Sequence, residues 1–146
     1  MTRDLQSAIT TRSDTRSIAI DAPREHVFAF VADPENLPRW AVGFCRSIRR
    51  DEAGRWIVST GQGDIPVRYE TDEQAGTVDF HLTTAPDTEL AAFSRVVANG
   101  DGAEYVFTQF QHPGMSDDAF EAQVRALGEE LHVLRGLLHA RAACPV

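Results

Sequence analysis

The residues best suited to move protons are a histidine, a tyrosine and an arginine in the second half of the chain. His112 ends the last predicted strand, beside the start of a helix, where a pocket mouth would lie; a loop-stabilising role fits it as well. Tyr105 lies in the same predicted strand. Arg95 is expected on the same strand face as Phe93 and Val97, because alternate residues of a strand point the same way. A charge on an apolar face must be paired, reach water or contact a polar ligand group. We therefore take His112, Tyr105 and Arg95 as candidate catalytic or ligand-contacting residues.

The remaining histidines favour structural interpretations. Glu129 and His132 form one Glu-x-x-His step, whereas di-iron bundles need two such steps and further glutamates, so a solvated helix face is favoured. His132 and His139 are separated by ~10 Å along a helix, which is too far for one metal ion. His81 shares a strand face with Asp79, and this face is expected to meet solvent. The sequence predicts no metal site and no cofactor.

No familiar nucleotide or hydrolase motif is present. Gly61-Gln62-Gly63 precedes a strand rather than a helix and lacks the third glycine and the lysine of a phosphate loop. A hairpin turn explains this segment better. Because GxSxG, HExxH and EF-hand patterns are also missing, hydrolysis by a serine or zinc motif has no support.

A set of aromatic and leucine residues could line an apolar pocket. Tyr and Trp side chains combine an apolar body with one hydrogen-bonding tip, which suits a mostly dry pocket with few polar contacts. Plain core packing, with each tip bonded to backbone, is an equally compatible interpretation. The predicted lining consists of Trp40, Trp56, Tyr69, Phe80, Phe93, Phe107, Leu127 and Leu131.

The elements that position these residues begin with one strand and two short helices. Ile18 and Ile20 alternate with small residues, which predicts a strand from Arg16 to Asp21. Apolar residues then recur at helical spacing up to Asp33. Asp33 can cap a second short helix, with Pro34 at its first position.

Six antiparallel strands are expected between Phe44 and His112. Turn residues interrupt this region about every 8 to 13 residues, the spacing of hairpin-linked strands. A long helix is expected from Ser116 to about Ala140, and its apolar residues form one stripe. The stripe consists of Phe120, Val124, Leu127, Leu131, Leu134 and Leu138. Only the sheet offers a partner surface large enough to cover it.

Length and composition are those of one ordinary globular domain. The chain has 146 residues, 42% of them apolar, and a formal net charge of -8, which disfavours nucleic acid and anionic membrane surfaces as partners. It has no apolar run long enough for a signal peptide or a membrane span. Cys45 and Cys144 are only two and have no metal-binding spacing, so reduced thiols and a cytoplasmic location are expected.

Two segments resemble a known superfamily. Ile18 to Trp40 reads IAIDAPREHVFAFVADPENLPRW, and His112 to Asp118 reads HPGMSDD at the entry to the last helix. In these segments the chain is similar to the START-like helix-grip superfamily (SRPBCC), which contains the polyketide cyclase/dehydrase and lipid-transport proteins. The resemblance implies an α+β fold in which a seven-stranded, curved antiparallel sheet wraps a long C-terminal helix, with two short helices between the first two strands. We expect a polar, flexible tail over residues 1–14, the ligand-binding domain over 15–140 and a C-terminal tail over 141–146.

The resemblance implies three functions of different classes. The leading expectation is binding of a small hydrophobic or amphipathic molecule in an internal cavity, without insertion into a membrane. The alternative is a polyketide cyclase/dehydrase-type enzyme that uses pocket Tyr, His or Arg side chains for proton transfer. The third is a module that binds a protein partner, which would expose an apolar patch of several hundred Å². The sequence leaves the oligomeric state open, a homodimer included.

Overall fold

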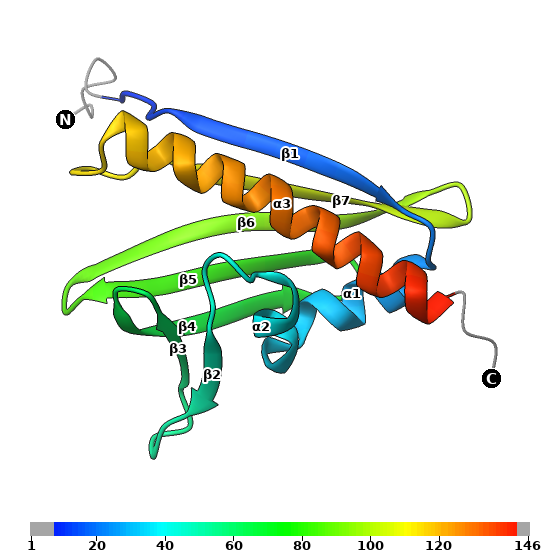
Figure 1. The fold of residues 1–146 in the computed structure, drawn as a ribbon, viewed down its shortest axis with the longest axis horizontal. Helices are drawn as coiled ribbons and strands as arrows, with labels where there is room; N and C mark the ends of the chain where they lie inside the picture. The colour runs from blue at the N-terminus through cyan, green and yellow to red at the C-terminus, as the bar shows by residue number, and fades with distance from the viewer. Residues whose placement is uncertain (1–7, 143–146) are drawn as a thin grey trace, which may run out of the picture.

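One curved sheet and one long helix dominate the architecture (Figure 1). The structure is a computed structural model that describes residues 8–142, with side chains described through His139. The elements in chain order are β1 (Ser13–Ile20), α1 (Arg24–Ala32), the 3-10 turn η2 (Pro34–Asn36), α2 (Leu37–Trp40), β2 (Ser47–Arg50), β3 (Trp56–Thr60), β4 (Gly63–Asp72), β5 (Thr77–Ala85), β6 (Thr88–Asn99), β7 (Gly102–Phe110) and α3 (Asp117–Ala142). The seven strands form one antiparallel sheet in the order β1-β7-β6-β5-β4-β3-β2. The expected α+β helix-grip fold is confirmed.

β1 forms one edge of the sheet and pairs with the last strand. It runs antiparallel to β7 from Ser13 opposite Phe110 to Ile20 opposite Ala103. The strand thus begins at Ser13, before the expected Arg16, because backbone pairing with β7 extends it through polar residues that carry no apolar alternation. Ser13 and Asp14, which we expected in the tail, therefore belong to the sheet. The rest of the expected tails lies partly outside the described residues, as does Cys144.

The short helices follow the predicted signals. α1 buries its apolar residues, Val27, Phe28, Phe30 and Val31. Asp33 caps the next turn, since its Oδ1 accepts a hydrogen bond from Glu35 N at 3.0 Å, and Pro34 is the first residue of η2. These contacts confirm the predicted start of the second helical segment.

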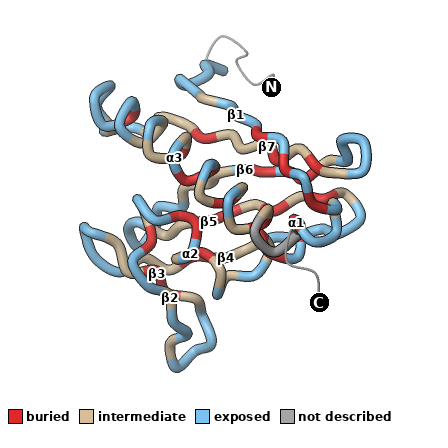
Figure 2. Tube along the Cα trace, turned by 45° about the vertical axis from the view of Figure 1, so that its right-hand side comes forward, coloured by how far each residue is buried: buried red, intermediate tan, exposed pale blue. Residues whose placement is uncertain are grey.

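Strand register determines which side chains share the concave face. Tyr69 on β4 lies opposite Phe80 on β5, and Phe107 on β7 lies opposite Ser94 on β6. Directly opposed residues of an antiparallel pair point to the same side. The hairpin turns are largely exposed, whereas buried positions gather in the middle of the sheet (Figure 2).

α3 lies across the concave side and packs mainly against β1 and α2 (Figure 1). Ser116 caps it by accepting a hydrogen bond from Ala119 N to Oγ at 3.1 Å. The predicted stripe is confirmed, since Val124 is half-buried and its other members are buried. Those buried members are Phe120, Leu127, Leu131, Leu134 and Leu138.

Candidate functional site

Five aromatic side chains on the concave side contact one another in an unbroken series. Trp40 meets Tyr105 edge-on with ring centroids 6.2 Å apart, and Tyr105 lies 6.3 Å from Phe107. Phe107 lies 5.8 Å from Phe80, which in turn lies 5.0 Å from Tyr69. α2, β7, β5 and β4 therefore bring four residues of the predicted lining and the candidate Tyr105 together. We call these five residues the aromatic chain.

The aromatic chain runs from a sealed end to a more accessible one. Trp40 and Tyr105 are 2% and 0% exposed, whereas Tyr69 and Phe107 are half-buried. Leu82, half-buried on β5, extends the apolar surface beside Tyr69. The accessible end thus offers apolar surface at the opening of the concave face.

The other predicted lining residues divide into three groups. Leu127 and Leu131 are buried in the same core from α3. Trp56 is half-buried on β3, with the guanidinium of Arg50 4.4 Å from its ring centroid. Phe93 does not line the interior, because it is 42% exposed and on the outer face, where it meets Phe110 edge-on at 6.1 Å.

Three polar tips of the aromatic chain are buried without a hydrogen-bond partner among the described residues: Trp40 Nε1, Tyr69 Oη and Tyr105 Oη. Ser94 lies beside the Tyr105 phenol; its hydroxyl donates to Val78 O at 2.6 Å, and its oxygen can still accept a hydrogen bond from Tyr105 Oη. An unsatisfied buried polar group costs about 1 to 3 kcal/mol, so the unpaired tips of Trp40 and Tyr69 require an explanation.

Burial keeps both phenols neutral. It raises the pKa of Tyr105 far above its usual value, and the neighbouring Ser94 offsets part of that rise. Burial also raises the pKa of Tyr69, and the nearby Tyr105, Cys45 and Asp33 raise it further. Both hydroxyls are therefore available as hydrogen-bond donors at any physiological pH.

A fourth buried tip without a partner belongs to Gln109, further along the inner face of β7. Its Oε1 accepts a hydrogen bond from Gln123 Nε2 on α3 at 2.8 Å, while its own Nε2 has no partner among the described residues. Gln109 lies four residues beyond Tyr105 on the same strand face, roughly 13 Å away. The two cannot bind the same ligand atom.

A buried carboxyl on α3 was missed by the sequence analysis. Glu130 is 6% exposed, and its Oε2 accepts a hydrogen bond from Gly43 N at 2.9 Å. Burial raises the pKa of Glu130 to about 7, partly offset by hydrogen bonds from the backbone of Gly43 and Phe44 and reinforced by Glu129. The carboxyl thus fastens the connection between α2 and β2, residues 41–46, to α3. Its position between Leu127 and Leu134 of the apolar stripe was the available signal.

Cys45, in the same connection, is a structural thiol. It is buried, and its Sγ donates to Ser47 O at 3.3 Å. Burial, reinforced by the nearby Glu130, raises the pKa of Cys45 to about 11, so the thiol stays protonated and unreactive.

The candidate proton-transfer residues are not brought together. Arg95 lies on the outer face with its Nε donating to Ala75 O at 3.0 Å, because the inner positions of β6 are taken by Ser94 and Val96. His112 follows the end of β7, roughly 20 Å from Tyr105 along the chain, and partial burial lowers its pKa. Only Tyr105 of the three belongs to the aromatic chain.

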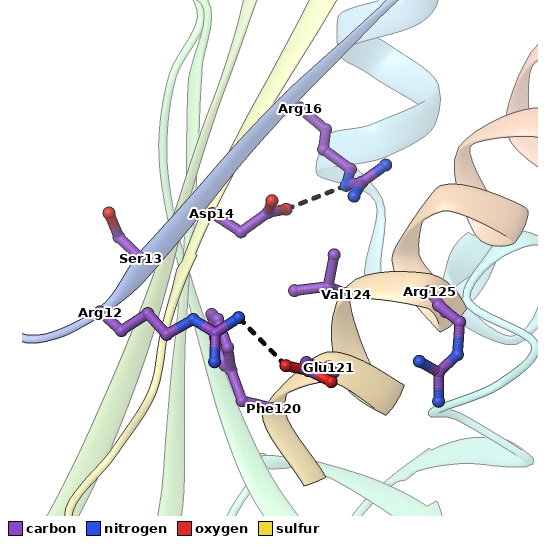
Figure 3. A pocket seen from close by; sticks show the side chains of 8 residues that line it. All are labelled: Arg12, Ser13, Asp14, Arg16, Phe120, Glu121, Val124 and Arg125. Atoms are coloured by element: carbon purple, nitrogen blue, oxygen red, sulfur yellow. Dashed lines mark hydrogen bonds and ion pairs between the residues drawn. The ribbon is translucent and has the colours of Figure 1, made fainter. Parts of the chain in front are cut away.

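Two hollows lie at the surface. One, of about 370 Å³, lies between β1 and α3. An ion pair between Arg12 and Glu121 at 3.4 Å joins its two sides, and a second pair, between Arg16 and Asp14 at 3.0 Å, lies along β1 (Figure 3). The other, of about 420 Å³, lies between the end of β1 and the turn from β6 to β7. Neither is lined by a member of the aromatic chain, so the internal cavity stays a prediction.

The described residues contain neither a metal-binding cluster nor a membrane-spanning helix. Within residues 8–142, no three His, Cys, Asp or Glu side chains are placed to hold a metal ion. His81 lies on the outer face between Glu70 and Glu89, with Nε2 and Nδ1 at 3.1 and 3.4 Å from the respective carboxylates. In the same part of the chain, no helix is both long and apolar enough to cross a membrane.

Solved structures share this fold at low sequence identity. The Zhui aromatase/cyclase from Streptomyces sp. R1128 aligns with a TM-score of 0.72 and 18% identity over 92% of this chain and 98% of its own. A START superfamily protein from Mycobacterium smegmatis aligns at 0.61 and 16% over 88% and 97%. The Aha1 dimer from Colwellia psychrerythraea aligns at 0.66 and 14% over 87% and 96%. These likenesses concern the fold alone.

The sequence itself matches one family. No functionally curated protein is significantly similar to the chain. Residues 12–138, however, match the family model described as polyketide cyclase / dehydrase and lipid transport. Because that match covers the strands, the short helices and most of α3, the chain belongs to the polyketide cyclase/dehydrase and lipid-transport family.

Proposed function

We propose that this protein binds a small hydrophobic or amphipathic molecule between the concave face of the sheet and α3. The observation that carries this proposal is the aromatic chain, which continues from the half-buried Tyr69 and Phe107 to the sealed Trp40 and Tyr105. Aromatic rings provide large apolar contact area with few rotatable bonds, as small-molecule sites require. Family membership supports a site of this kind.

Access to the sealed end requires movement of the 41–46 connection. In Figure 1 this connection passes in front of β4 and β5, and the Gly43–Glu130 hydrogen bond places it against α3. Phe44 packs against the core from the same connection. Displacing this segment would open the concave face, whereas displacing α3 would expose its five buried stripe residues. The connection is therefore the less costly route of entry.

Binding of 1-anilinonaphthalene-8-sulfonate to the folded protein tests the proposal. We expect dye fluorescence to rise on binding and the melting temperature to increase with dye concentration. Phe107→Ala should weaken dye binding, because it interrupts the aromatic chain. Phe93→Ala is the matched control, since it removes the same side chain from the outer face. Absence of saturable binding, or equal weakening in both variants, would contradict the proposal.

The enzyme alternative rests on family membership and on one interior phenol. A polyketide cyclase/dehydrase would use Tyr105 as its proton donor, without help from Arg95 on the outer face or from His112 beyond β7. Turnover of a poly-carbonyl substrate that is lost in Tyr105→Phe while binding persists would favour this alternative. A protein-binding module ranks third, because the exposed large apolar residues among those described are scattered: Ile9, Val42 and Phe93.

A further inference from the structure

β1 presents the longer of the two open edges of the sheet. β1 and β2 are the outer strands, with eight and four residues respectively. An unpaired strand edge can pair with another strand, and proteins protect such edges by shortness, proline, bulges or repelling charges. β2 is short and carries the adjacent Arg49 and Arg50. β1 contains no proline and pairs with β7 without a shift of register from Ser13 to Ile20, so it has none of the backbone protections.

The backbone of β1 faces this open edge at alternate residues. Gln111 N donates to Arg12 O at 2.8 Å, which identifies Arg12 and Gln111 as a hydrogen-bonded pair of the β1–β7 ladder. In an antiparallel ladder such pairs alternate with pairs that do not bond, in which the side chains lie closer together. The hydroxyls of Thr15 and Thr108 lie 2.8 Å apart, as expected for a pair of the second kind. The N–H and C=O groups that point away from β7 are therefore those of Ser13, Thr15, Ser17 and Ala19.

The outward side of β1 is accessible along most of its length. Ser13, Thr15 and Ser17 are exposed, and no hydrogen bond within residues 8–142 reaches their outward backbone groups. α3 approaches β1 on the concave side, where a Cβ added at Gly128 would lie 3.6 Å from Arg16 Nη1. Figure 1 shows β1 as the outer rim of the sheet, with α3 passing inside it. A second strand can therefore reach the edge without displacing the helix.

The charges of β1 complement those of a second copy of β1. Asp14 and Arg16 lie two positions apart on the inner face, with 3.0 Å between Oδ2 and Nε (Figure 3). When two β1 strands pair antiparallel about Thr15, each Asp14 lies directly opposite Arg16 of the other copy. Centring the pairing one residue earlier or later sets Asp14 against Asp14 or Arg16 against Arg16, and like charges directly opposite are unfavourable. Charge therefore selects the register centred on Thr15, in which the outward backbone groups also meet one another.

We propose that two copies of this protein join edge to edge through β1, antiparallel and centred on Thr15, so that their two seven-stranded sheets become one. The outward backbone groups of Ser13, Thr15 and Ser17 supply the hydrogen bonds. Asp14 and Arg16 of both copies form a neutral cluster of four charges, and both α3 helices lie on the same side of the joined sheet. This interaction surface is separate from the aromatic chain and does not depend on the proposed function.

Sedimentation velocity over a range of chain concentrations measures the association. A strand edge buries little surface, so the dimer is expected at roughly 10 to 500 µM chain rather than at nanomolar concentration. The formal net charge of -8 on each chain opposes association at long range, and about 0.15 M salt screens this repulsion. The fraction of dimer should rise with concentration under these conditions.

Two complementary charge reversals test the register. Asp14→Arg sets an arginine opposite Arg16 of the other copy, and Arg16→Asp sets an aspartate opposite Asp14, so each variant alone should associate roughly tenfold more weakly than the wild type. An equimolar mixture of the two should associate again, because every arginine then faces an aspartate. Recovery in the mixture also shows that both variants are folded. Arg68→Asp, an exposed reversal on β4, is the control and should leave association unchanged.

Amide hydrogen exchange locates the contact on the strand. Exchange should slow with rising concentration at Thr15 and Ser17, whose N–H groups point outward. At Asp14 and Arg16 it should be slow at every concentration, because their N–H groups point toward β7. This alternation is expected only when the free edge of β1 is the surface that pairs.

Each part of the proposal can be overturned. A chain that stays monomeric throughout the concentration range contradicts the dimer. A mixture of charge variants that fails to associate, while the wild type does so, contradicts the register. Dimerisation without slower exchange at Thr15 and Ser17 places the interface elsewhere. Slow exchange at these two residues in dilute, monomeric protein would mean that another segment of the same chain occupies the edge, which also overturns the proposal.

Discussion

The two faces of the sheet treat polar side chains in opposite ways. On the outer face, Arg68 and His81 lie within ion-pair distance of Glu89 and Glu70, and Arg95 bonds to Ala75 O. On the inner face, Trp40 Nε1 and Tyr69 Oη are buried without a hydrogen-bond partner among the described residues. Outer polar groups bond to one another and can reach water, whereas inner ones depend on the few polar groups buried beside them, as Ser94 does on Val78 O. The difference shows that polar groups on the inner face have fewer possible partners than those on the outer face.

Truncating one phenylalanine on each face gives the largest expected contrast. Phe80→Ala should lower the free energy of unfolding by about 3 to 5 kcal/mol, because it leaves a cavity in the core. Phe93→Ala, on the outer face, should change it by less than about 1 kcal/mol. Urea denaturation of both variants measures the contrast. Similar losses would show that the two faces are not energetically distinct.

Glu130 is a buried ionisable group on the inner side, where the other buried tips are neutral. Its contribution to stability should depend on pH. In the folded protein the pKa of Glu130 is about 7, raised above the ordinary 4.5. Its contribution to the free energy of unfolding is therefore fully present below about pH 4.5 and is lost as pH rises through about 7. Relative to Glu130→Gln, the wild type should lose about 2 to 3 kcal/mol of unfolding free energy between about pH 4.5 and 8. The titratable groups that face the carboxyl are Cys45 and Glu129.

Urea midpoints at several pH values measure this slope. Glu121→Gln is the matched control, because Glu121 is exposed on the same helix and does not influence the pKa of Glu130. A wild type whose slope equals that of Glu130→Gln would contradict the buried position of the carboxyl.

A methyl group added beside that carboxyl should have a smaller effect. A Cβ at Gly43 would lie 3.2 Å from Glu130 Oε2 and 3.4 Å from Ala126 Cβ, so Gly43→Ala should destabilise the protein by about 1 to 2 kcal/mol. Gly136→Ala is the control, since nothing lies within 4 Å of its added Cβ, and helix propensity should stabilise it by up to about 1 kcal/mol. Thermal melts should therefore shift in opposite directions for the two variants.

The smallest effect is expected on the outer face. Glu89→Gln removes the carboxylate shared by Arg68 and His81, but exposed ion pairs contribute little, so the change in unfolding free energy should stay below about 1 kcal/mol. Added salt should shrink even this difference. A larger loss would mean that the outer charges also hold the sheet together.

Most of the fold follows from local patterns in the sequence. The apolar stripe of α3 and the cap at Asp33 act over one or two helical turns, so they can be recognised without knowing the partners. Local pattern does not show which face of β6 is buried, because both faces carry apolar residues, with Phe93 on one side and Val96 on the other. Pairing with β7, where Tyr105 lies opposite Val96, settles the choice.

The site was predictable only in part. Aromatic residues with polar tips indicated a pocket, and three of them, Trp40, Tyr69 and Tyr105, belong to the aromatic chain. Whether a buried tip has a hydrogen-bond partner depends on all the groups around it. A local sequence pattern cannot predict those groups. Glu130 escaped for a related reason: its burial comes from Gly43 and Phe44, which approach from a distant part of the chain.

The pairing of β1 with β7 limits the order in which the strands can pair while the chain is being synthesised. β1 leaves the ribosome early, but its only neighbour in the sheet is among the last strands to emerge. Until then β1 must wait as an unpaired edge while the β2–β7 hairpins form locally. Such long-range closure slows folding and leaves the nascent chain open to wrong pairings. β1 can therefore join the sheet only after β7 has been made.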